Sequence, residues 1–232
     1  LAEKVRTEKA DLGIAVDPDV DRLVLITEKG EPLGEEYTIA SVVNFVLSRE
    51  SIVKNIKSKV KSEKLKIKTI DLKVVVNLST TRAVDDIAKS YGATVTRTPV
   101  GEINVAKKMK EIGAVIGGEG SGGVILPEAH YGRDAIVGIG LVLQMLVEFG
   151  RSLSEYKSTL PQYYITKDKF EIGSLNVDEL LNQVIQKYKS VKINTDDGVK
   201  IEFTDSWVHL RKSNTEPIVR IIAEAPSVDM AQ

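Results

Sequence analysis

The feature that most constrains the fold is an alternation of short β-branched runs with helix-period segments through the middle of the chain. Valine- and isoleucine-rich runs alternate with segments whose apolar residues recur at helical spacing. The strand-like runs are residues 72–78, 93–97, 114–116 and 124–126, and the helical segments are residues 81–91, 103–112 and 135–149. A crossover helix is the usual connection between parallel strands. The pattern therefore predicts an α/β domain with a largely parallel, mixed sheet.

The beginning of the chain has a different order of elements. It comprises a charged helix-like stretch, two strand-like runs, a helix and a lysine- and serine-rich segment: residues 1–9, 12–16, 23–27, 35–49 and 51–68. The last of these has poor periodicity, so we expect a surface excursion there. The chain starts at Leu1 in a helix-like stretch, not at Met, and so looks like a piece of something longer.

The pattern of strand-like and helical segments changes after Gly150, and we predict a domain boundary near residue 160. Residues 163–172 resemble a strand, and residues 176–188 form an amphipathic helical pattern with Asn176 as N-cap. Four more strand-like runs follow at residues 191–194, 199–203, 207–210 and 218–224. Strands separated by short turns favour antiparallel pairing. This part is predicted to be a smaller α+β domain with a mostly antiparallel sheet.

Composition limits the classes of function. Apolar residues make up 42% and charged residues 28% of the chain, and the net charge is -1. Such a balance offers no basic field for nucleic acid, and no apolar run reaches the roughly 18 residues of a membrane span. Cysteine is absent, which excludes disulfides, thiolate zinc ligands and a cysteine nucleophile. We expect a cytoplasmic location without nucleic-acid or membrane partners.

Three carboxylates alternate in the turn Asp17-Pro18-Asp19-Val20-Asp21-Arg22. Their mutual repulsion in a tight turn is relieved by a cation, and oxygen ligands of this kind suit Mg²⁺. A solvated acidic turn is the alternative. An EF-hand is disfavoured because position six of the loop is Arg22 and strands flank it, and an aspartyl-nucleophile phosphatase should offer further motifs that do not stand out here. Arg22 is placed to face a phosphoryl group.

A second loop, Gly117-Gly118-Glu119-Gly120-Ser121-Gly122-Gly123, joins two strand-like runs. It satisfies G-x-G-x-x-G, but a dinucleotide fingerprint opens a helix and this loop opens a strand. A simple glycine-rich hairpin turn is one interpretation. The other is a ligand loop, in which Glu119 and Ser121 offer hydrogen-bonding groups to sugar hydroxyls on an approachable backbone.

A third loop, Arg211-Lys212-Ser213-Asn214-Thr215-Glu216-Pro217, precedes the last strand-like run. An Arg fork, two hydroxyl groups, an amide and turn N–H groups can cradle a phosphate. The alternative is a polar turn closed by proline. The chain contains no Walker A sequence, so nucleotide phosphoryl transfer of that type is not indicated.

In this order, the three loops resemble those of the α-D-phosphohexomutases, which include phosphomannomutase, phosphoglucomutase and phosphoglucosamine mutase. The first loop is similar to the family's metal-binding loop, the second to its sugar-binding loop, and the third, followed by Arg220, to its phosphate-binding loop. The resemblance implies a four-domain enzyme. Residues 1–38 would be the end of domain two, residues 39–158 domain three and residues 159–232 domain four, with a four-stranded antiparallel sheet.

The resemblance also implies a reaction and a set of roles. A phosphoryl group would move between O1 and O6 of a hexose phosphate through a phosphoserine enzyme and a hexose 1,6-bisphosphate intermediate. Mg²⁺ would be held by Asp17, Asp19 and Asp21, with Arg22 near the transferred group. Glu119 and Ser121 would bind the sugar. The phosphate that is not transferred would be bound by Arg211, Ser213, Asn214 and Thr215.

The chain departs from the family pattern at several points. The phosphoserine motif, a Ser followed by His-Asn-Pro, is absent from the 232 residues, so we expect the chain alone to be inactive. Many relatives have His where this chain has Gly123, and some have His at the position of Glu102. His130 is a candidate general acid or base because its pKa is ordinarily near neutrality. His209 alternates within a strand, which suggests a structural role, and residues 79–82 are expected to approach the sugar.

Two classes of function remain open from the sequence. The first is a phosphohexomutase whose N-terminal part, carrying the serine, is a partner of this chain. The second is a non-catalytic phosphosugar-binding protein. The sequence does not identify the preferred hexose, and it does not give the oligomeric state.

Overall fold

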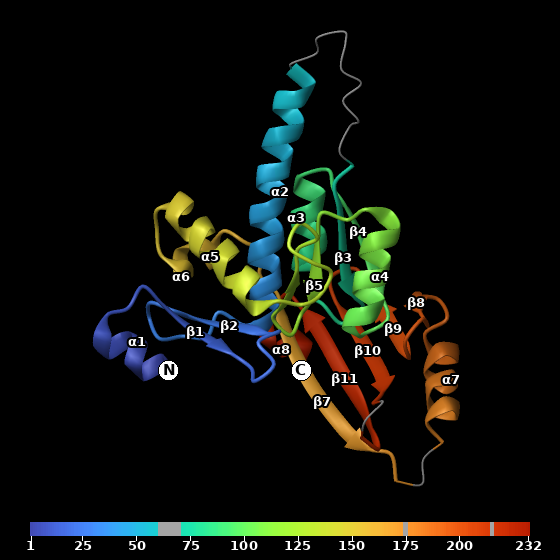
Figure 1. Ribbon diagram of the computed structural model, residues 1–232. Helices are drawn as coiled ribbons and strands as arrows, with labels where there is room; N and C mark the ends of the chain where they lie inside the picture. Colours follow the sequence, from blue (N-terminus) through green and yellow to red (C-terminus); the bar gives the residue numbers. More distant parts are fainter. Residues whose placement is uncertain (60–70, 174–175, 214–215) are drawn as a thin grey trace. The chain divides into compact units, whose positions relative to one another are not determined.

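The computed structural model describes residues 1–59, 71–173, 176–213 and 216–232 (Figure 1). They form two compact units, Leu1–Pro161 and Gln162–Gln232. The first unit contains α1 (Ala2–Glu8), β1 (Leu12–Val16), β2 (Leu23–Thr27), α2 (Glu35–Lys59), β3 (Lys73–Asn77), α3 (Ala83–Ser90), β4 (Thr94–Thr98), α4 (Glu102–Ile112), β5 (Ile116–Glu119), β6 (Gly123–Ile125), α5 (Ala135–Phe149) and α6 (Leu153–Ser158).

The main sheet of the first unit has the strand order β4-β3-β5-β6. β3 pairs in parallel with β4 and β5, whereas β6 pairs antiparallel with β5. This arrangement confirms the predicted largely parallel, mixed sheet. β1 and β2 form a separate antiparallel pair in which Leu12 lies opposite Thr27.

Helices cover both faces of the main sheet. Gly117 and Gly118 are neighbours on β5 and therefore face opposite sides. A Cβ on Gly117 would overlap Met109 of α4, and one on Gly118 would lie 2.8 Å from Ile39 of α2. The two glycines therefore allow α4 and α2 to approach β5 from opposite faces. One core cluster lies between α4 and the sheet and comprises Val75, Val105, Ala106, Met109, Ala114 and Ile125.

In the first unit, the observed bounds of two elements differ from the predicted ones. α2 continues to Lys59, although residues 51–68 were expected as an irregular excursion. The sequence of residues 50–59 contains good helix formers such as Glu and Lys, which favour a helix even where the apolar periodicity is weak. Residues 60–68 lie outside the described residues. The predicted strand at residues 114–116 is displaced to Ile116–Glu119, because Gly117 and Gly118 pair with Val75 and Val76 of β3.

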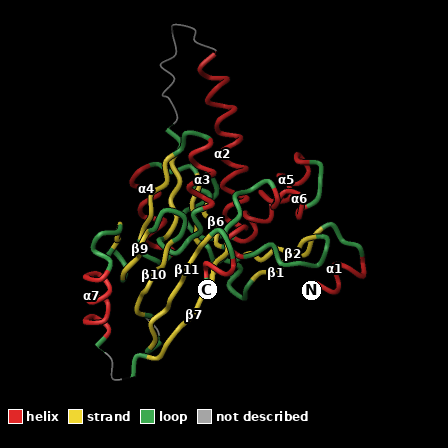
Figure 2. The backbone as a smooth tube through the Cα atoms, turned by 180° about the vertical axis from the view of Figure 1, so that it is seen from behind, coloured by secondary structure: helices red, strands yellow, loops and turns green. Residues whose placement is uncertain are grey.

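The second unit contains β7 (Tyr164–Glu171), α7 (Val177–Lys187), β8 (Lys192–Asn194), β9 (Val199–Glu202), β10 (Trp207–Lys212), β11 (Ile218–Ala225) and α8 (Val228–Ala231). Its sheet is antiparallel throughout, with the order β7-β11-β10-β9-β8. Figure 2 shows β7, β11, β10 and β9 in this order. The resemblance implied four strands, and this number is wrong because the short strand β8 adds a fifth at the edge beside β9. Asn176 caps α7 as predicted, accepting a hydrogen bond from the Glu179 amide.

Among the described residues, no helix combines the length and the apolar character that a membrane crossing needs.

Candidate functional site

The acidic turn connects β1 to β2 and is stabilised by its own first carboxylate. Asp17 Oδ1 accepts hydrogen bonds of 3.1 Å from the amides of both Asp21 and Arg22. Two backbone hydrogen bonds tie this region to later segments: the Ala135 amide donates to the Val20 carbonyl, and the Leu23 amide donates to the Gly122 carbonyl, both at 3.0 Å. The acidic turn therefore lies beside the start of α5 and the glycine-rich loop.

Asp17 and Asp21 interact directly through their side chains. Desolvation and the hydrogen bond with Asp17 raise the pKa of Asp21, and Arg133 opposes that rise. Desolvation acts upward on the pKa of Asp17 as well, but hydrogen bonds from the Arg22 amide and from Asp21 outweigh it and hold that pKa below its usual value. The two carboxylates are thus electrostatically linked, with opposite effects on their pKa values.

The fit of this turn to a divalent cation is partial. Asp21 Oδ1 is buried and makes no hydrogen bond within the described part of the chain. The carboxylates of Asp17 and Asp21 supply the oxygen donors that Mg²⁺ prefers. Among the described residues, however, no three acidic or histidine side chains converge on one point, so the exposed Asp19 does not complete the predicted set of ligands here.

Arg22 lies over the carboxylates of its own turn. Its Nε is 3.3 Å from Asp17 Oδ2 and 3.6 Å from Asp21 Oδ1, and half of its side chain is exposed. The guanidinium group partly neutralises the turn and remains accessible to an anionic ligand.

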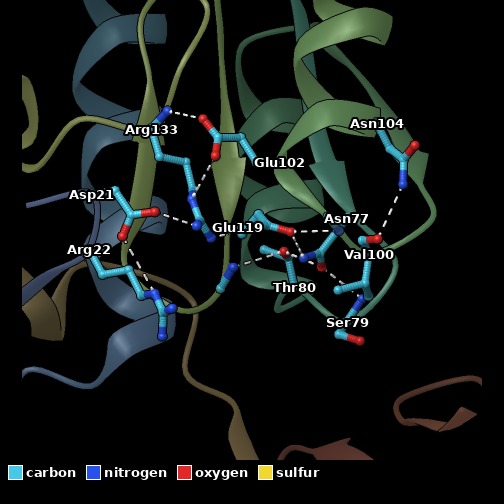
Figure 3. Close-up of polar contacts among 12 residues, drawn as sticks. Asp21, Arg22, Asn77, Ser79, Thr80, Val100, Glu102, Asn104, Glu119 and Arg133 are labelled. Atoms are coloured by element: carbon cyan, nitrogen blue, oxygen red, sulfur yellow. Dashed lines mark hydrogen bonds and ion pairs between the residues drawn. The ribbon is translucent and has the colours of Figure 1, made fainter. Parts of the chain in front are cut away.

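Glu119, at the end of β5, is buried and hydrogen-bonded on both oxygens (Figure 3). Its Oε1 accepts hydrogen bonds from Asn77 Nδ2 at 2.7 Å and from the Gly101 amide at 3.0 Å. Its Oε2 accepts from an Arg133 N–H at 2.6 Å. Ser121 is half-buried in the turn between β5 and β6. The predicted sugar-binding carboxylate is therefore fixed by protein groups before any ligand arrives.

The segment that follows β3 lies beside this loop. Asn77 Oδ1 accepts hydrogen bonds of 2.9 Å from the Ser79 amide and the Thr80 hydroxyl, and Thr80 Oγ1 accepts one of 3.0 Å from the Gly120 amide. Arg97 holds the same turn by donating to the carbonyls of Asn77, Thr80 and Thr81, at 3.0, 2.7 and 3.1 Å. Residues 79–82 were expected near the sugar, but Asn77 was missed, although a polar residue at the carboxyl end of a buried parallel strand is a recognisable signal.

Arg133 joins the acidic turn to the glycine-rich loop, and it was not among the residues predicted from the sequence. Its guanidinium group contacts the carboxylates of Asp21 and Glu119, and its Nε is 3.6 Å from Glu102 Oε2 (Figure 3). Burial alone would lower the pKa of Arg133, but Glu119, Asp21 and Glu102 together raise it. A polar residue next to the helix N-cap Asp134 gave no distinctive pattern, so only the fold reveals this contact.

Gly123 makes room for Arg133. A Cβ at Gly123 would overlap Arg133 Cδ and would lie 3.0 Å from Cγ. The absence of a side chain at position 123 therefore has a steric cause in this chain.

His130 is paired with the carboxylate that caps α5. Its Nε2 lies 2.8 Å from Asp134 Oδ2, while Asp134 Oδ1 accepts a hydrogen bond from the Val137 amide. The hydrogen bond with His130, together with those from the backbone, holds the pKa of Asp134 below its usual value despite desolvation. This geometry supports a role in the N-terminus of α5, and the catalytic role of His130 stays a prediction.

In the second unit, Arg211 is fixed by the turn between β8 and β9. Its Nε is 3.1 Å from Asp197 Oδ2, and its side chain is 11% exposed. Ser213 is buried, and its Oγ accepts a hydrogen bond of 3.3 Å from the Glu216 amide. The predicted phosphate contacts Asn214 and Thr215 lie outside the described residues.

Three cations lie in one row across the second sheet. Arg211 on β10 is opposite Arg220 on β11, and Arg220 is opposite Lys169 on β7. Like charges directly opposite each other destabilise a sheet, and carboxylates offset that cost here: Asp197 pairs with Arg211, and Glu216 pairs with Arg220 at 2.6 Å. Such a row favours a bound anion.

Two domain profiles of one family match the chain. The profile described as "Phosphoglucomutase/phosphomannomutase, alpha/beta/alpha domain III" matches residues 51–164, and the profile of the C-terminal domain of the same proteins matches residues 174–232. The chain belongs to the α-D-phosphohexomutase family. It is 36% identical over 231 residues to a phosphoglucomutase/phosphomannomutase of Thermococcus kodakarensis, and 35% identical over 233 residues to a phosphoglucosamine/phosphogalactosamine mutase of Sulfurisphaera tokodaii.

The phosphohexomutase chain spans about half the length of these relatives. The matches cover 99% of this chain in both cases, but 46% of the Thermococcus protein and 48% of the Sulfurisphaera protein. Both relatives are therefore longer proteins that contain a segment similar to this one.

Solved structures show the same fold. A phosphoglucomutase/phosphomannomutase family protein from Burkholderia thailandensis matches with a TM-score of 0.75 at 22% identity, over 99% of this chain and 46% of that one. An Aspergillus fumigatus N-acetylphosphoglucosamine mutase, solved with GlcNAc-6P and magnesium, matches with a TM-score of 0.64 at 16% identity, over 99% of this chain and 50% of that one.

Proposed function

We propose that this chain is part of a phosphohexomutase that moves a phosphoryl group between O1 and O6 of a hexose or hexosamine phosphate, through a phosphoserine enzyme and a hexose 1,6-bisphosphate. The observation that carries the proposal is the joining of the acidic turn to the glycine-rich loop through Arg133. Segments about a hundred residues apart in the sequence thereby form one polar site. The family membership and the names of the relatives support the class of reaction.

At the reacting end, the proposed roles fall on the acidic turn. Asp17, Asp19 and Asp21 would hold Mg²⁺, which supplies positive charge to neutralise the transferred phosphoryl group. Arg22 has a half-exposed guanidinium group that can face the same phosphoryl oxygens. Because no three acidic side chains converge within the described part of the chain, a site made of all three carboxylates requires the turn to adjust.

At the sugar, Glu119 and Ser121 would orient the hydroxyl groups. A carboxylate accepts hydrogen bonds from hydroxyl groups and repels phosphate, so Glu119 suits the sugar and not its phosphate. Each oxygen of Glu119 already accepts hydrogen bonds from the protein, and a carboxylate has about four lone-pair positions in total. The preorganised carboxylate retains capacity for one ligand hydroxyl group.

In the second unit, Arg211, Ser213, Asn214 and Thr215 would bind the phosphate that is not transferred. Binding of a distant phosphate contributes energy that positions the reacting end of the sugar. Asp197 orients Arg211 through Nε, which leaves the two terminal nitrogens of the guanidinium group to form a fork toward the ligand.

A direct binding experiment tests the phosphate site. We expect mannose 6-phosphate or glucosamine 6-phosphate to bind the chain in isothermal titration calorimetry. Arg211→Lys should weaken that binding about tenfold, because lysine keeps the charge but loses the planar two-pronged donor. The control is Lys192→Gln, which removes an exposed cation of the same unit that pairs with Glu202.

Equal affinities of the wild type and Arg211→Lys would show that the third loop binds something else. A loss of affinity in Lys192→Gln as large as that in Arg211→Lys would indicate nonspecific attraction of the anion. Binding without any turnover by the complete protein would favour the rival function, a non-catalytic phosphosugar-binding protein, which the absence of a Ser-His-Asn-Pro motif from these residues motivates.

A further inference from the structure

The site around Arg133 carries an excess of negative charge. Within the described part of the chain, the carboxylates of Asp17, Asp21, Glu102 and Glu119 are paired with two guanidinium groups, those of Arg22 and Arg133. Two negative charges remain in excess, even without the exposed Asp19. That excess is the charge which one divalent cation would neutralise.

Arg133 is bound to the carboxylate that such a cation would need. One of its terminal nitrogens contacts Asp21 Oδ2, and the other donates to Glu119 Oε2 (Figure 3). The side chain is 15% exposed, so solvent screens these contacts little. A cation that coordinates Asp21 must therefore share that carboxylate with a guanidinium group, or displace it.

We propose that Arg133 is a positioning residue that competes with the divalent cation for Asp21 and so couples the occupancy of the acidic turn to the glycine-rich loop. The inference rests on the proposed function, because it takes the acidic turn as the cation site. Without the cation, Arg133 holds Asp21 and Glu119 in one bridge. With the cation on Asp21, Arg133 keeps its contacts with Glu119 and Glu102, and the terminal nitrogen that had contacted Asp21 is released for a ligand.

A purely structural clamp would behave differently. If Arg133 only held α5 against β5, its replacement would lower the stability of the fold and leave the cation affinity unchanged or weaker. Competition predicts the opposite sign, because removing a nearby positive charge favours cation binding. The direction of the change in affinity therefore separates the two roles.

The experiment measures Mn²⁺ binding to the chain by electron paramagnetic resonance, with Mn²⁺ as a probe that takes similar oxygen ligands to Mg²⁺. We expect Arg133→Gln to bind Mn²⁺ roughly tenfold more tightly than the wild type, within the usual range of coupling between sites. The matched control is Arg49→Gln, which removes a guanidinium group of the same unit that pairs with Glu148. Its affinity should equal that of the wild type.

Arg133→Gln leaves the buried Glu119 without its cationic partner and could impair folding. The same substitution is therefore also made in a Glu119→Gln background, where no carboxylate is stranded. Arg133→Gln/Glu119→Gln should bind Mn²⁺ more tightly than Glu119→Gln alone. Unchanged or weaker binding in both backgrounds, or no Mn²⁺ binding by any variant, would overturn the inference.

The Asp21→Asn variant distinguishes the failure of this inference from the failure of the proposed cation site in the acidic turn. If Asp21→Asn abolishes Mn²⁺ binding while Arg133→Gln leaves it unchanged, the acidic turn is the cation site and the competition is refuted. If Asp21→Asn binds Mn²⁺ as the wild type does, the cation site itself is misplaced, and the inference fails with it.

Discussion

Buried charged side chains in this chain are stabilised by fixed partners. For Arg133, the contacts with its partners depend on the absence of a side chain at Gly123. Removing one partner of a buried pair costs more than the pair contributes, since the remaining charge stays desolvated. Arg133 can reach Asp21 and Glu119 only because Gly123 has no side chain on its path. Arg97 is similarly held, by three carbonyl groups and Asp85.

At this scale we predict that Gly123→Ala destabilises the chain. The added methyl group would overlap Arg133 Cδ, so the guanidinium group must shift away from Glu119 or Asp21. Overpacking of this kind typically costs about 1–3 kcal/mol in the free energy of unfolding. Urea unfolding measures the change, and Gly140→Ala serves as control.

Gly140 lies on the exposed face of α5, and a methyl group at this position would meet only open space. Alanine there should raise the free energy of unfolding by roughly 0.5–1 kcal/mol, because glycine weakens a helix. A Gly123→Ala variant as stable as the wild type would mean that Arg133 accommodates the methyl group without losing its partners.

Among the elements, β10 combines structural and candidate binding residues on one strand. Trp207 Nε1 donates to Glu224 Oε1 at 2.6 Å, His209 is fully buried, and Arg211 follows two residues later on the same face. His209 Nε2 lies 2.6 Å from the Asp197 carbonyl oxygen, and Asp197 also contacts Arg211. The turn between β8 and β9 is thus fixed to β10 at two points, which supports the orientation of the Arg211 fork.

The titration of His209 predicts a pH dependence of stability. Desolvation lowers the pKa of His209 to about 4, with Lys200 and Arg211 adding to the effect and the hydrogen bond with Asp197 opposing it. Above pH 6.5 the imidazole is neutral in both the folded and the unfolded state, so it adds no pH dependence to the stability. Below that pH the imidazole is protonated in the unfolded state but stays neutral in the folded state. The free energy of unfolding therefore falls until the pH reaches about 4.

His209→Gln can keep a donor toward the Asp197 carbonyl but does not titrate. Between pH 7 and 4.5 the wild type should lose about 2 kcal/mol more unfolding free energy than His209→Gln does. Guanidinium denaturation of both proteins at the two pH values makes the comparison, and carboxylate titrations cancel in the difference. Parallel losses would show that His209 is protonated in the folded protein.

For the whole molecule, the proposed activity needs groups beyond those of the three loops. The family reaction implied by the resemblance uses a serine nucleophile, and these 232 residues contain no Ser-His-Asn-Pro motif. The relatives are about twice as long as the chain. In the proposed function the three loops bind and orient a sugar phosphate, but these 232 residues offer no nucleophile of the family type.

We therefore predict that the chain alone does not convert hexose 1-phosphates to 6-phosphates, even with Mg²⁺ and hexose 1,6-bisphosphate. A coupled dehydrogenase assay that detects the 6-phosphate makes the measurement, with a full-length relative as positive control. Turnover that scales with the amount of chain would show that another residue acts as the nucleophile.

The sequence by itself determined the elements and the types of chemistry. Periodicity located β1, β2 and α5 at their observed bounds, and short motifs identified Asp17, Glu119 and Arg211 as candidates. These features are local, because hydrophobic periodicity and turn composition are set by residues close together in the chain. Where the local signal was weak, as beyond Arg49 in α2 and at the two glycines of β5, the predicted bounds were wrong.

Only the tertiary structure decided which groups meet. Asn77 and Arg133 are ordinary residues in the sequence, yet the parallel sheet and the start of α5 bring them to opposite sides of the Glu119 carboxylate. The same packing ties Asp21 to Arg133. In the second unit, the register of the antiparallel sheet aligns Arg211, Arg220 and Lys169 across three strands. Contacts between residues distant in the chain depend on strand order, register and burial, which no local pattern of side chains specifies.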